Sequence, residues 1–317
     1  MLMDASQPAT RPDHGARRRT AVAVIGGGAI GAYLAAAAED AGHDVTVCVR
    51  SPLDQLEITR DGKRHVLKAR IVTDPAGARP APWVVVATKA QDTGGAATWL
   101  KRLVVPETVV VAAQNGVGHE ERLRPLVGRA VVVPALIYAA VERVAPGRIV
   151  LHTGERIVVP QGAPGAAFAR LLAGSGIAVV EDADFLTASW RKLLSNIASN
   201  PVTALTMRRV GVMREPAIRE LVRGLLREAV AAGRAEGAKL SERDIEDVLV
   251  LLTRFNPSGG SSMLYDRLAG RPLEHQHLTG AVVRAAERHG IAVPLNQTIL
   301  TLLEALDTGL RGADHAR

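Results

Sequence analysis

Three residue types are scarce in this sequence, and the first is cysteine. Cys48 is the single cysteine among 317 residues, which excludes an internal disulfide and fits a reducing, cytoplasmic location. Aromatic residues are the second scarce type, with three each of Phe, Trp and Tyr. The net charge of +7 would suit a nucleic-acid-binding protein, but the basic residues are scattered along the chain and no recognition motif accompanies them. We therefore expect no nucleic-acid partner.

Lysine is the third scarce type, because six lysines stand among 39 basic residues and the others are arginines. Where arginine is so strongly preferred, a retained lysine is expected to be needed for its own chemistry. The pKa of an ammonium falls readily when the group is desolvated, whereas a guanidinium stays protonated. The lysines are therefore candidates for proton transfer.

One lysine stands in a distinctive stretch, residues 190 to 201. Read as a helix, this stretch places Lys192, Asn196 and Asn200 at i, i+4 and i+8 on one face. Pro201 lacks a backbone N–H, so the row should end there in a kink or a frayed turn. One interpretation is an amphipathic helix with a solvated polar face. The other, which we favour, is a substrate-facing row in which Lys192 donates a proton or polarises a carbonyl.

The N-terminal 19 residues are polar and have no periodic pattern, so we expect a disordered tail. Arg17, Arg18 and Arg19 precede a long uncharged run, which is also the pattern of a signal peptide. Glycines interrupt that run at spacings that belong to a different motif. We therefore expect neither a signal peptide nor a membrane partner.

That motif is a dinucleotide-binding fingerprint. A β-branched strand over residues 20 to 25 leads into G-x-G-x-x-G, an alanine-rich helix and a second strand over residues 44 to 49. The first glycine makes a tight turn, the second lets the pyrophosphate approach the backbone, and the third lets the helix pack closely on the strand. The coenzyme-binding residues expected in this loop are Gly26, Gly28, Ala29, Ile30 and Gly31.

The residue at the end of the second strand indicates which coenzyme is used. The fingerprint places an Asp or Glu there for the ribose 2′-hydroxyl, but this chain has Arg50. An arginine can instead pair with a 2′-phosphate, which favours NADPH over NADH. The alternative is a solvated arginine at a strand end.

Two further buried strands are expected at residues 83 to 87 and 109 to 113. Lys89 and Asn115 follow them, and ligands of doubly wound sheets lie at the carboxyl ends of the strands. Both residues should therefore lie at the coenzyme cleft, although Asn-Gly is also an ordinary turn signal. The other elements expected in this domain are a hairpin at 56 to 72, strands at 130 to 138, 148 to 151, 156 to 159 and 177 to 180, and a helix at 164 to 173.

Beyond residue 184 only helices are expected. They cover residues 215 to 236, 241 to 254, 262 to 269, 274 to 289 and 295 to 308, besides the Lys192 helix. Ser262 begins one of them, and its hydroxyl could bind a carboxylate or simply cap the helix. The fold class is α/β: a disordered tail (1–19), an N-terminal Rossmann domain with a doubly wound parallel sheet (20–184) and an all-helical C-terminal domain (185–317).

The motifs, taken in order, resemble those of the ketopantoate reductase family, the NADPH-dependent 2-dehydropantoate 2-reductases. The resemblance covers residues 20 to 307 and implies reduction of a small 2-oxo acid, ketopantoate, in pantothenate biosynthesis. The motifs that carry it are Gly26-x-Gly28-x-x-Gly31, Arg50, Lys89, Gln114-Asn115-Gly116, Trp190-x-Lys192-x-x-x-Asn196-x-x-x-Asn200-Pro201, Ser261-Ser262-Met263-Leu264-x-Asp266 and Gly270-Arg271-x-x-Glu274.

The resemblance also implies roles for individual residues. Lys192 would donate the proton to the ketone oxygen, and Glu274 would be an acid–base or substrate-orienting carboxylate. Substrate contacts would come from Asn115, Asn196, Asn200 and Ser262, and coenzyme contacts from Arg50, Lys89, Asn115 and the glycine loop. No metal is implied, and a homodimer is compatible with the family.

The chain departs from the family pattern after Glu274, where it has His275-Gln276-His277. Two histidines at i and i+2 of a helix diverge and do not form a metal pair. The change lies close to the expected substrate wall, which leaves two alternatives open. One is a reductase of a different 2-oxo acid, and the other is a non-catalytic NADP-binding regulator with the same fold.

Overall fold

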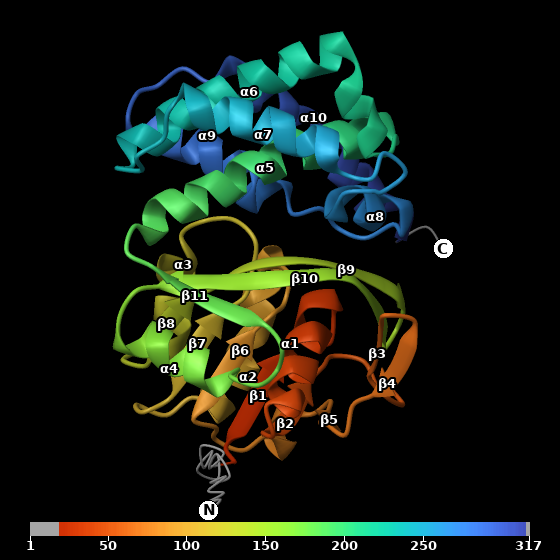
Figure 1. Ribbon diagram of the computed structural model, residues 1–317, viewed down its shortest axis with the longest axis vertical. Helices are drawn as coiled ribbons and strands as arrows, with labels where there is room; N and C mark the ends of the chain where they lie inside the picture. The colour runs from red at the N-terminus through yellow and green to blue at the C-terminus, as the bar shows by residue number, and fades with distance from the viewer. Residues whose placement is uncertain (1–18, 315–317) are drawn as a thin grey trace, which may run out of the picture.

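The chain folds into an α/β part and a helical part, as the computed structural model shows for residues 19–314 (Figure 1). The last strand of the α/β part, β11, spans Ala178–Asp182, and the first helix of the helical part, α5, spans Phe185–Thr206. The predicted fold class, a Rossmann sheet followed by helices, is confirmed. The tail expected at residues 1 to 18 lies outside the described residues.

A six-stranded, all-parallel sheet forms the centre of the α/β part. Its strand order is β5-β2-β1-β6-β7-β8. These strands are almost continuously apolar and buried, as expected when helices or another sheet cover both faces. Their bounds are β1 Ala21–Ile25, β2 Asp44–Cys48, β5 Arg70–Val72, β6 Trp83–Val86, β7 Val109–Ala112 and β8 Val131–Pro134.

A second sheet, which the sequence did not predict, lies across one face of the first, with a helix between them. Its path is β11-β10-β3-β4, and β9 pairs antiparallel with β10. The expected strand at 130 to 138 is wrong, because it is divided between β8 in one sheet and β9 in the other. The strands expected at 148 to 151 and 156 to 159 are one continuous strand, β10. The bounds are β3 Glu57–Arg60, β4 Lys63–Val66, β9 Leu136–Ala145 and β10 Arg148–Pro160.

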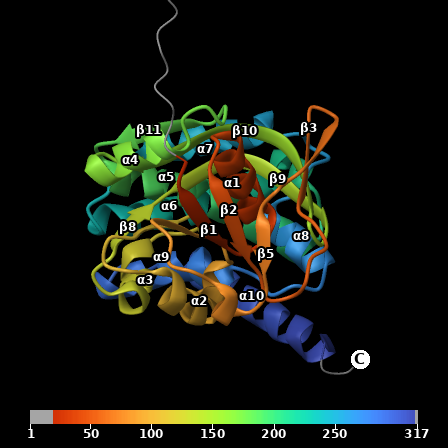
Figure 2. The ribbon, with the colours of Figure 1, turned by 90° about the horizontal axis from the view of Figure 1, so that it is seen from below.

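Helices separate and cover these sheets. Helix α1 contacts strands of both sheets and shares a core with their inner faces, whereas α2 and α3 cover the opposite face of the parallel sheet (Figure 2). The order of layers is therefore α2 and α3, the parallel sheet, α1, and the second sheet. The helices of this part are α1 Ala29–Asp40, η1 Pro75–Gly77, η2 Ala90–Ala96, α2 Ala97–Leu103, α3 His119–Val127 and α4 Ala163–Leu171.

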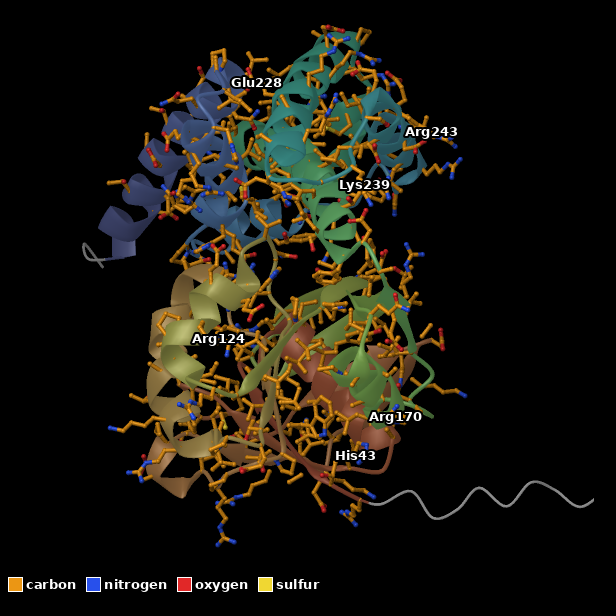
Figure 3. All side chains as sticks on the ribbon, turned by 90° about the vertical axis from the view of Figure 1, so that its left-hand side faces the viewer. His43, Arg124, Arg170, Glu228, Lys239 and Arg243 are labelled. Carbon is orange, nitrogen blue, oxygen red and sulfur yellow. The ribbon has the colours of Figure 1, made fainter. Side chains whose placement is uncertain are left out.

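The helical part forms its own apolar core around α5. The bounds of its other elements are η3 Val210–Arg214, α6 Pro216–Ala235, α7 Glu242–Arg254, α8 Ser262–Leu268, η4 His275–His277, α9 Thr279–Arg288 and α10 Pro294–Asp314. Figure 3 shows the side chains of both parts, with Glu228, Lys239 and Arg243 on the helical part and Arg124 and Arg170 on the α/β part. Within residues 19–314, no helix is long and apolar enough to span a membrane.

Two predictions for the helical part are wrong. The frayed turn expected at Pro201 is wrong, since α5 continues to Thr206. Val202 and Ala204 are buried in the core, and their packing offsets the hydrogen bond that proline cannot make. The helix expected from 274 to 289 is broken at Leu278, whose φ of −110° and ψ of −88° separate η4 from α9.

Candidate active site

The order of the parallel strands reverses between β1 and β6, which is the position where sheets of this type bind their ligands. Chain segments leave these two strands in opposite directions along the sheet, so the loops after their carboxyl ends diverge. The glycine loop follows β1, Lys89 follows β6, and Asn115 follows β7. The residues expected at the coenzyme cleft therefore stand at the carboxyl edge of three adjacent strands.

The glycine loop has the geometry that its motif requires. Gly26 has a φ of +106°, and a Cβ there would be 3.0 Å from the backbone of Ala87 and Thr88. A Cβ on Gly31 would be 1.8 Å from the carbonyl oxygen of Gly26, so only glycine allows α1 to start this close to the loop. Around Gly28, by contrast, no atom of the described residues lies within 4 Å of the Cβ position, apart from Gly28 itself and its chain neighbours.

That open space fits a dinucleotide pyrophosphate. Gly28 is the N-cap of α1, and the first turn of α1 contains no acidic residue. The free backbone N–H groups and the positive end of the helix dipole therefore face an opening without a competing carboxylate. Arg50 lies beyond β2 with its side chain 78% exposed, and it forms an ion pair with Asp92 at 3.5 Å. An added phosphate could reach this exposed guanidinium.

Glu274 connects the helical part to the edge of the parallel sheet. Its buried carboxylate accepts hydrogen bonds from Lys89 Nζ at 3.0 Å, from the backbone N–H of Ala90 at 3.1 Å and from Asn115 Nδ2 at 3.3 Å. Three predicted site residues are thus in direct contact. Burial raises the pKa of Glu274, but the Lys89 charge and these donors lower it below its usual value overall. Glu274 is therefore ionised at neutral pH and suited to orienting, not to donating a proton.

Asp266 is a further candidate site residue, for which no role was predicted although it stands in one of the family motifs. Its buried carboxylate accepts from Lys89 Nζ at 2.8 Å and from Arg271 Nε at 2.9 Å. The ammonium of Lys89, expected to serve the coenzyme, is thus held between two carboxylates of the helical part. Burial lowers the pKa of Lys89, and the attraction of Glu274 and Asp266 more than reverses this, so the pKa is raised.

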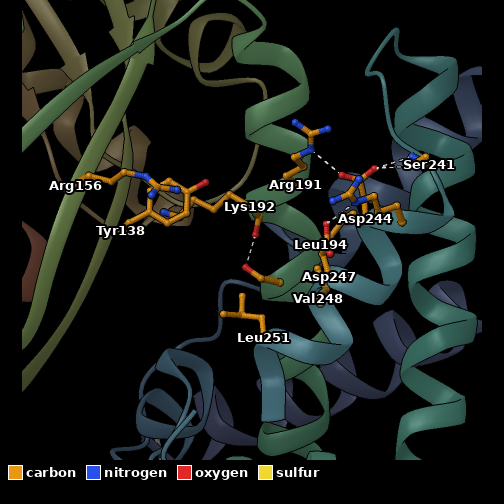
Figure 4. Close-up of a pocket in the computed structure, with 12 residues that line it drawn as sticks. Tyr138, Arg156, Arg191, Lys192, Leu194, Ser241, Asp244, Asp247, Val248 and Leu251 are labelled. Carbon is orange, nitrogen blue, oxygen red and sulfur yellow. Dashed lines mark hydrogen bonds and ion pairs between the residues drawn. The ribbon is translucent and has the colours of Figure 1, made fainter. Parts of the chain in front are cut away.

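Lys192 stands on the face of α5 that meets the long strands β9 and β10. Its partly buried ammonium donates to the carbonyl oxygen of Ile137 at 2.8 Å and lies 5.5 Å from the centre of the Tyr138 ring (Figure 4). Burial lowers the pKa of Lys192 to about 8, while the negative charge of Glu274 acts in the opposite direction. The group is thus a charged proton donor at neutral pH that gives up its proton more readily than an exposed lysine.

The two asparagines of the row differ in their surroundings. Asn200 is buried, and its Oδ1 accepts from Ser262 Oγ and from the N–H of Met263, both at 3.2 Å, which ties α5 to the start of α8. The Nδ2 of Asn196 is buried as well, and among the described residues it has no hydrogen-bond partner. A buried donor of this kind is costly unless a ligand oxygen satisfies it.

Helix α8 joins the two groups of site residues. Ser262 and Asp266 are one turn apart and lie on the same face of the helix. One contacts Asn200 and the other Lys89, so the α5 row and the carboxyl edge of the sheet converge on α8. Ser262 itself does not cap α8, since Ser261 does so by accepting from the N–H of Leu264.

Gln114 is a second residue whose importance the sequence did not reveal. Its buried side-chain amide donates to the backbone and hydroxyl of Thr88 and to Thr93 Oγ1, and its Oε1 accepts from Arg122. The carbonyl oxygen of Gln114 lies 2.8 Å from His119 Nε2. These contacts hold the loop that carries Asn115 against the end of β6. The sequence signal for it was its place in the motif Gln114-Asn115-Gly116.

A pocket of about 600 Å³ borders Lys192 on the side of α5 that faces α7 (Figure 4). Arg191 and Asp244 form an ion pair of 2.6 Å in its wall. The residues that line the pocket are Tyr138, Arg156, Arg191, Lys192, Leu194, Ser195, Ser241, Arg243, Asp244, Asp247, Val248 and Leu251. The ammonium of Lys192 thus lies at the border between this pocket and the group around Glu274.

Comparison with known proteins agrees with this geometry. Residues 22–164 match the model of the ketopantoate reductase PanE/ApbA family, and residues 184–307 match the model of its C-terminal region. A 2-dehydropantoate 2-reductase of Caulobacter vibrioides is 39% identical over 90% of this chain and 99% of its own length.

Solved structures show the same fold. A PanE/ApbA family ketopantoate reductase from Ralstonia eutropha JMP134 superposes with a TM-score of 0.84 at 28% identity, covering 92% of this chain and 99% of its own. A dimeric ketopantoate reductase from Staphylococcus aureus superposes with a TM-score of 0.83 at 24% identity and the same coverage. The predicted resemblance is confirmed, and the chain belongs to the ketopantoate reductase family.

Proposed function

We propose that the protein is an NADPH-dependent 2-dehydropantoate 2-reductase, which reduces the C2 ketone of 2-dehydropantoate to an alcohol in pantothenate biosynthesis. This is the reaction of the family to which the chain belongs. The observation that supports it best is the placement of Lys192, a partly buried ammonium with a lowered pKa, between the two parts of the molecule. A non-catalytic regulator would need the glycine loop but would have no use for such a group.

The residues of this chain account for each requirement of the reaction. NADPH, when bound, supplies the hydride that reaches C2. The glycine loop and Arg50 would hold the coenzyme, and Lys89 would border it at the end of β6. As negative charge develops on the ketone oxygen, Lys192 would stabilise that charge and donate the proton from Nζ, which completes the alcohol.

The substrate would lie against α5 and α8. The unpaired Nδ2 of Asn196 would donate to a substrate oxygen, and the hydroxyl of Ser262 would meet the carboxylate. Asn200 keeps only its amide N–H groups for this purpose, because its oxygen is engaged by α8. Asn115 and the ionised Glu274 would orient the substrate without exchanging a proton. We further propose that the protein forms a homodimer, as the Staphylococcus aureus relative does, and that it is located in the cytoplasm.

The test is NADPH oxidation by the purified protein with 2-dehydropantoate and a panel of other 2-oxo acids. We expect turnover of 2-dehydropantoate to exceed that of the others. Preferred turnover of another acid would support the proposed reaction but contradict 2-dehydropantoate as the substrate. The histidines after Glu274 would then be the first residues to replace. NADPH binding without any turnover would establish the regulator instead.

The coenzyme preference should depend on Arg50. We expect Arg50→Asp to raise the KM for NADPH about 10- to 100-fold, because charge-assisted bonds to the 2′-phosphate contribute about 1.5–3 kcal/mol. The KM for NADH should change far less. Arg170→Asp makes the same charge change at the surface of α4 (Figure 3). It therefore controls for the effect of the protein's net charge on binding of the anionic coenzyme. An unchanged NADPH to NADH ratio would show that the 2′-phosphate lies elsewhere.

The reaction should also depend on pH through Lys192. Since burial lowers its pKa to about 8, the ammonium is present at pH 7 and is lost as the pH rises through 8. The value of kcat/KM should therefore be level at neutral pH and fall about tenfold per unit well above pH 8. Glu274→Gln removes a charge that favours the ammonium, so it should move this fall to lower pH. A level profile up to pH 10 would contradict the assignment.

A further inference from the structure

Strand β9 presents two consecutive groups to Lys192. The backbone carbonyl of Ile137 accepts a hydrogen bond from Nζ at 2.8 Å, and the ring of Tyr138 lies over the same ammonium, with 5.5 Å from Nζ to the ring centre. The guanidinium of Arg156, on β10, lies 4.7 Å from the centre of that ring (Figure 4). Tyr138 therefore contacts two cations, which are Arg156 and the proposed proton donor itself.

The face of an aromatic ring attracts a cation, and the attraction grows when both groups are shielded from water. Tyr138 and Lys192 are each partly buried. Burial raises the pKa of Tyr138, so its hydroxyl stays protonated and the ring carries no charge at neutral pH. The attraction that Lys192 experiences is therefore that of the ring face and not of a phenolate.

The other charged groups around Lys192 come from several elements. Glu274, before η4, is negative and favours the ammonium. His119, at the start of α3, is neutral at pH 7, because burial lowers its pKa to about 4. Charged groups of both signs on β10, α5 and α7 also line the pocket beside Lys192, namely Arg156, Arg191, Arg243, Asp244 and Asp247. The ring of Tyr138 thus adds to Glu274 in opposing the cost of burying the ammonium.

We propose that Tyr138 is a positioning residue for the reduction, whose ring, together with the Ile137 carbonyl, fixes the Lys192 ammonium at the cleft and favours its protonated form. This rests on the proposed role of Lys192. The contacts of Lys192 with the ring of Tyr138 and with the carbonyl of Ile137 do not require the tyrosine hydroxyl. A phenylalanine at position 138 is therefore the reference variant for testing the ring alone.

The test is a series at position 138 in the full-length protein, comparing Tyr138→Phe with phenylalanines that carry one, two and three ring fluorines. Fluorination weakens the negative ring face stepwise and hardly changes its shape. Between the first and last member, the pKa of the alkaline limb of kcat/KM should fall by about half a unit to one unit. The rate at pH 9 should fall about three- to tenfold in the same order. The Kd for NADPH and the thermal midpoint should stay constant.

Arg156→Gln is the matched control, because it removes the other cation at the same ring. We expect it not to lower the alkaline pKa. An alkaline limb that does not follow the number of fluorines would overturn the role of Tyr138, as would a parallel loss of thermal stability. Failure of the proposed role of Lys192 looks different, since a variant without its ammonium would then still turn over at a normal rate. Failure of the proposed function itself would appear as NADPH binding without turnover in the natural protein.

Discussion

A Lys192→Met variant is expected to bind NADPH as tightly as the natural protein and to reduce 2-dehydropantoate about 10²- to 10⁴-fold more slowly. This is the usual range for a lost general acid, and methionine keeps the aliphatic packing of the lysine stem. The loss should appear in kcat, because the ammonium acts on charge that develops only in the transition state. Steady-state kinetics beside fluorescence titration of NADPH measure the two quantities.

Lys239→Met provides the control for this substitution. Lys239 is 81% exposed on the helical part (Figure 3) and pairs with Asp184 at 3.0 Å, away from the proposed site. Its replacement removes the same charge and should leave both quantities unchanged. Equal losses of turnover and NADPH binding in Lys192→Met would show that Lys192 supports the coenzyme site instead of the chemistry.

The second large effect is expected from Lys89→Met, which should lower the free energy of unfolding by about 3 kcal/mol. Removing one partner of a buried ion pair costs about 3–5 kcal/mol, and the 37% exposure of Lys89 places it at the lower end. The carboxylate of Glu274, 4% exposed, would lose its cation, and that of Asp266, 6% exposed, would keep only Arg271. For a chain of this size the thermal midpoint should fall by roughly 5 °C.

A second substitution separates this explanation from a role in coenzyme binding. Adding Glu274→Gln to Lys89→Met removes the carboxylate charge that has lost its cation, so the double variant should recover part of the lost stability. Lys239→Met again serves as the lysine control. If Lys89→Met instead weakened NADPH binding at an unchanged thermal midpoint, the main role of Lys89 would be to bind the coenzyme and not to stabilise the contact between the two parts.

The parts of the site that the sequence predicted are those with local patterns. The spacing of Gly26, Gly28 and Gly31 reflects backbone conformations and close contacts within a few residues, and these are present in the structure. The face that carries Lys192 and Asn196 follows from helical periodicity alone. Such features require no knowledge of what packs around them.

The features that the sequence missed depend on distant partners. Lys89 and Glu274 are 185 residues apart, and no local pattern shows that they meet. Strand β10 pairs with β3, and this pairing joins Ile149 to Ile58. Because these residues are far apart in the sequence, local patterns did not predict the second sheet either. Tyr138 was one aromatic residue on an expected strand, and only the position of α5 above β9 gives it a role.

The contact between Gly116 and η4 has a consequence for alignment. Gly116 follows Asn115, has a φ of +92°, and a Cβ there would be 2.4 Å from the carbonyl oxygen of His277. Two backbones thus meet at this point with no side chain between them, and any larger residue would act as a spacer that carries Glu274 away from its donors. Displacements of about 1 Å can slow a reaction about 10²-fold. The distance between the loop after β7 and η4 therefore depends on the absence of a Cβ at position 116.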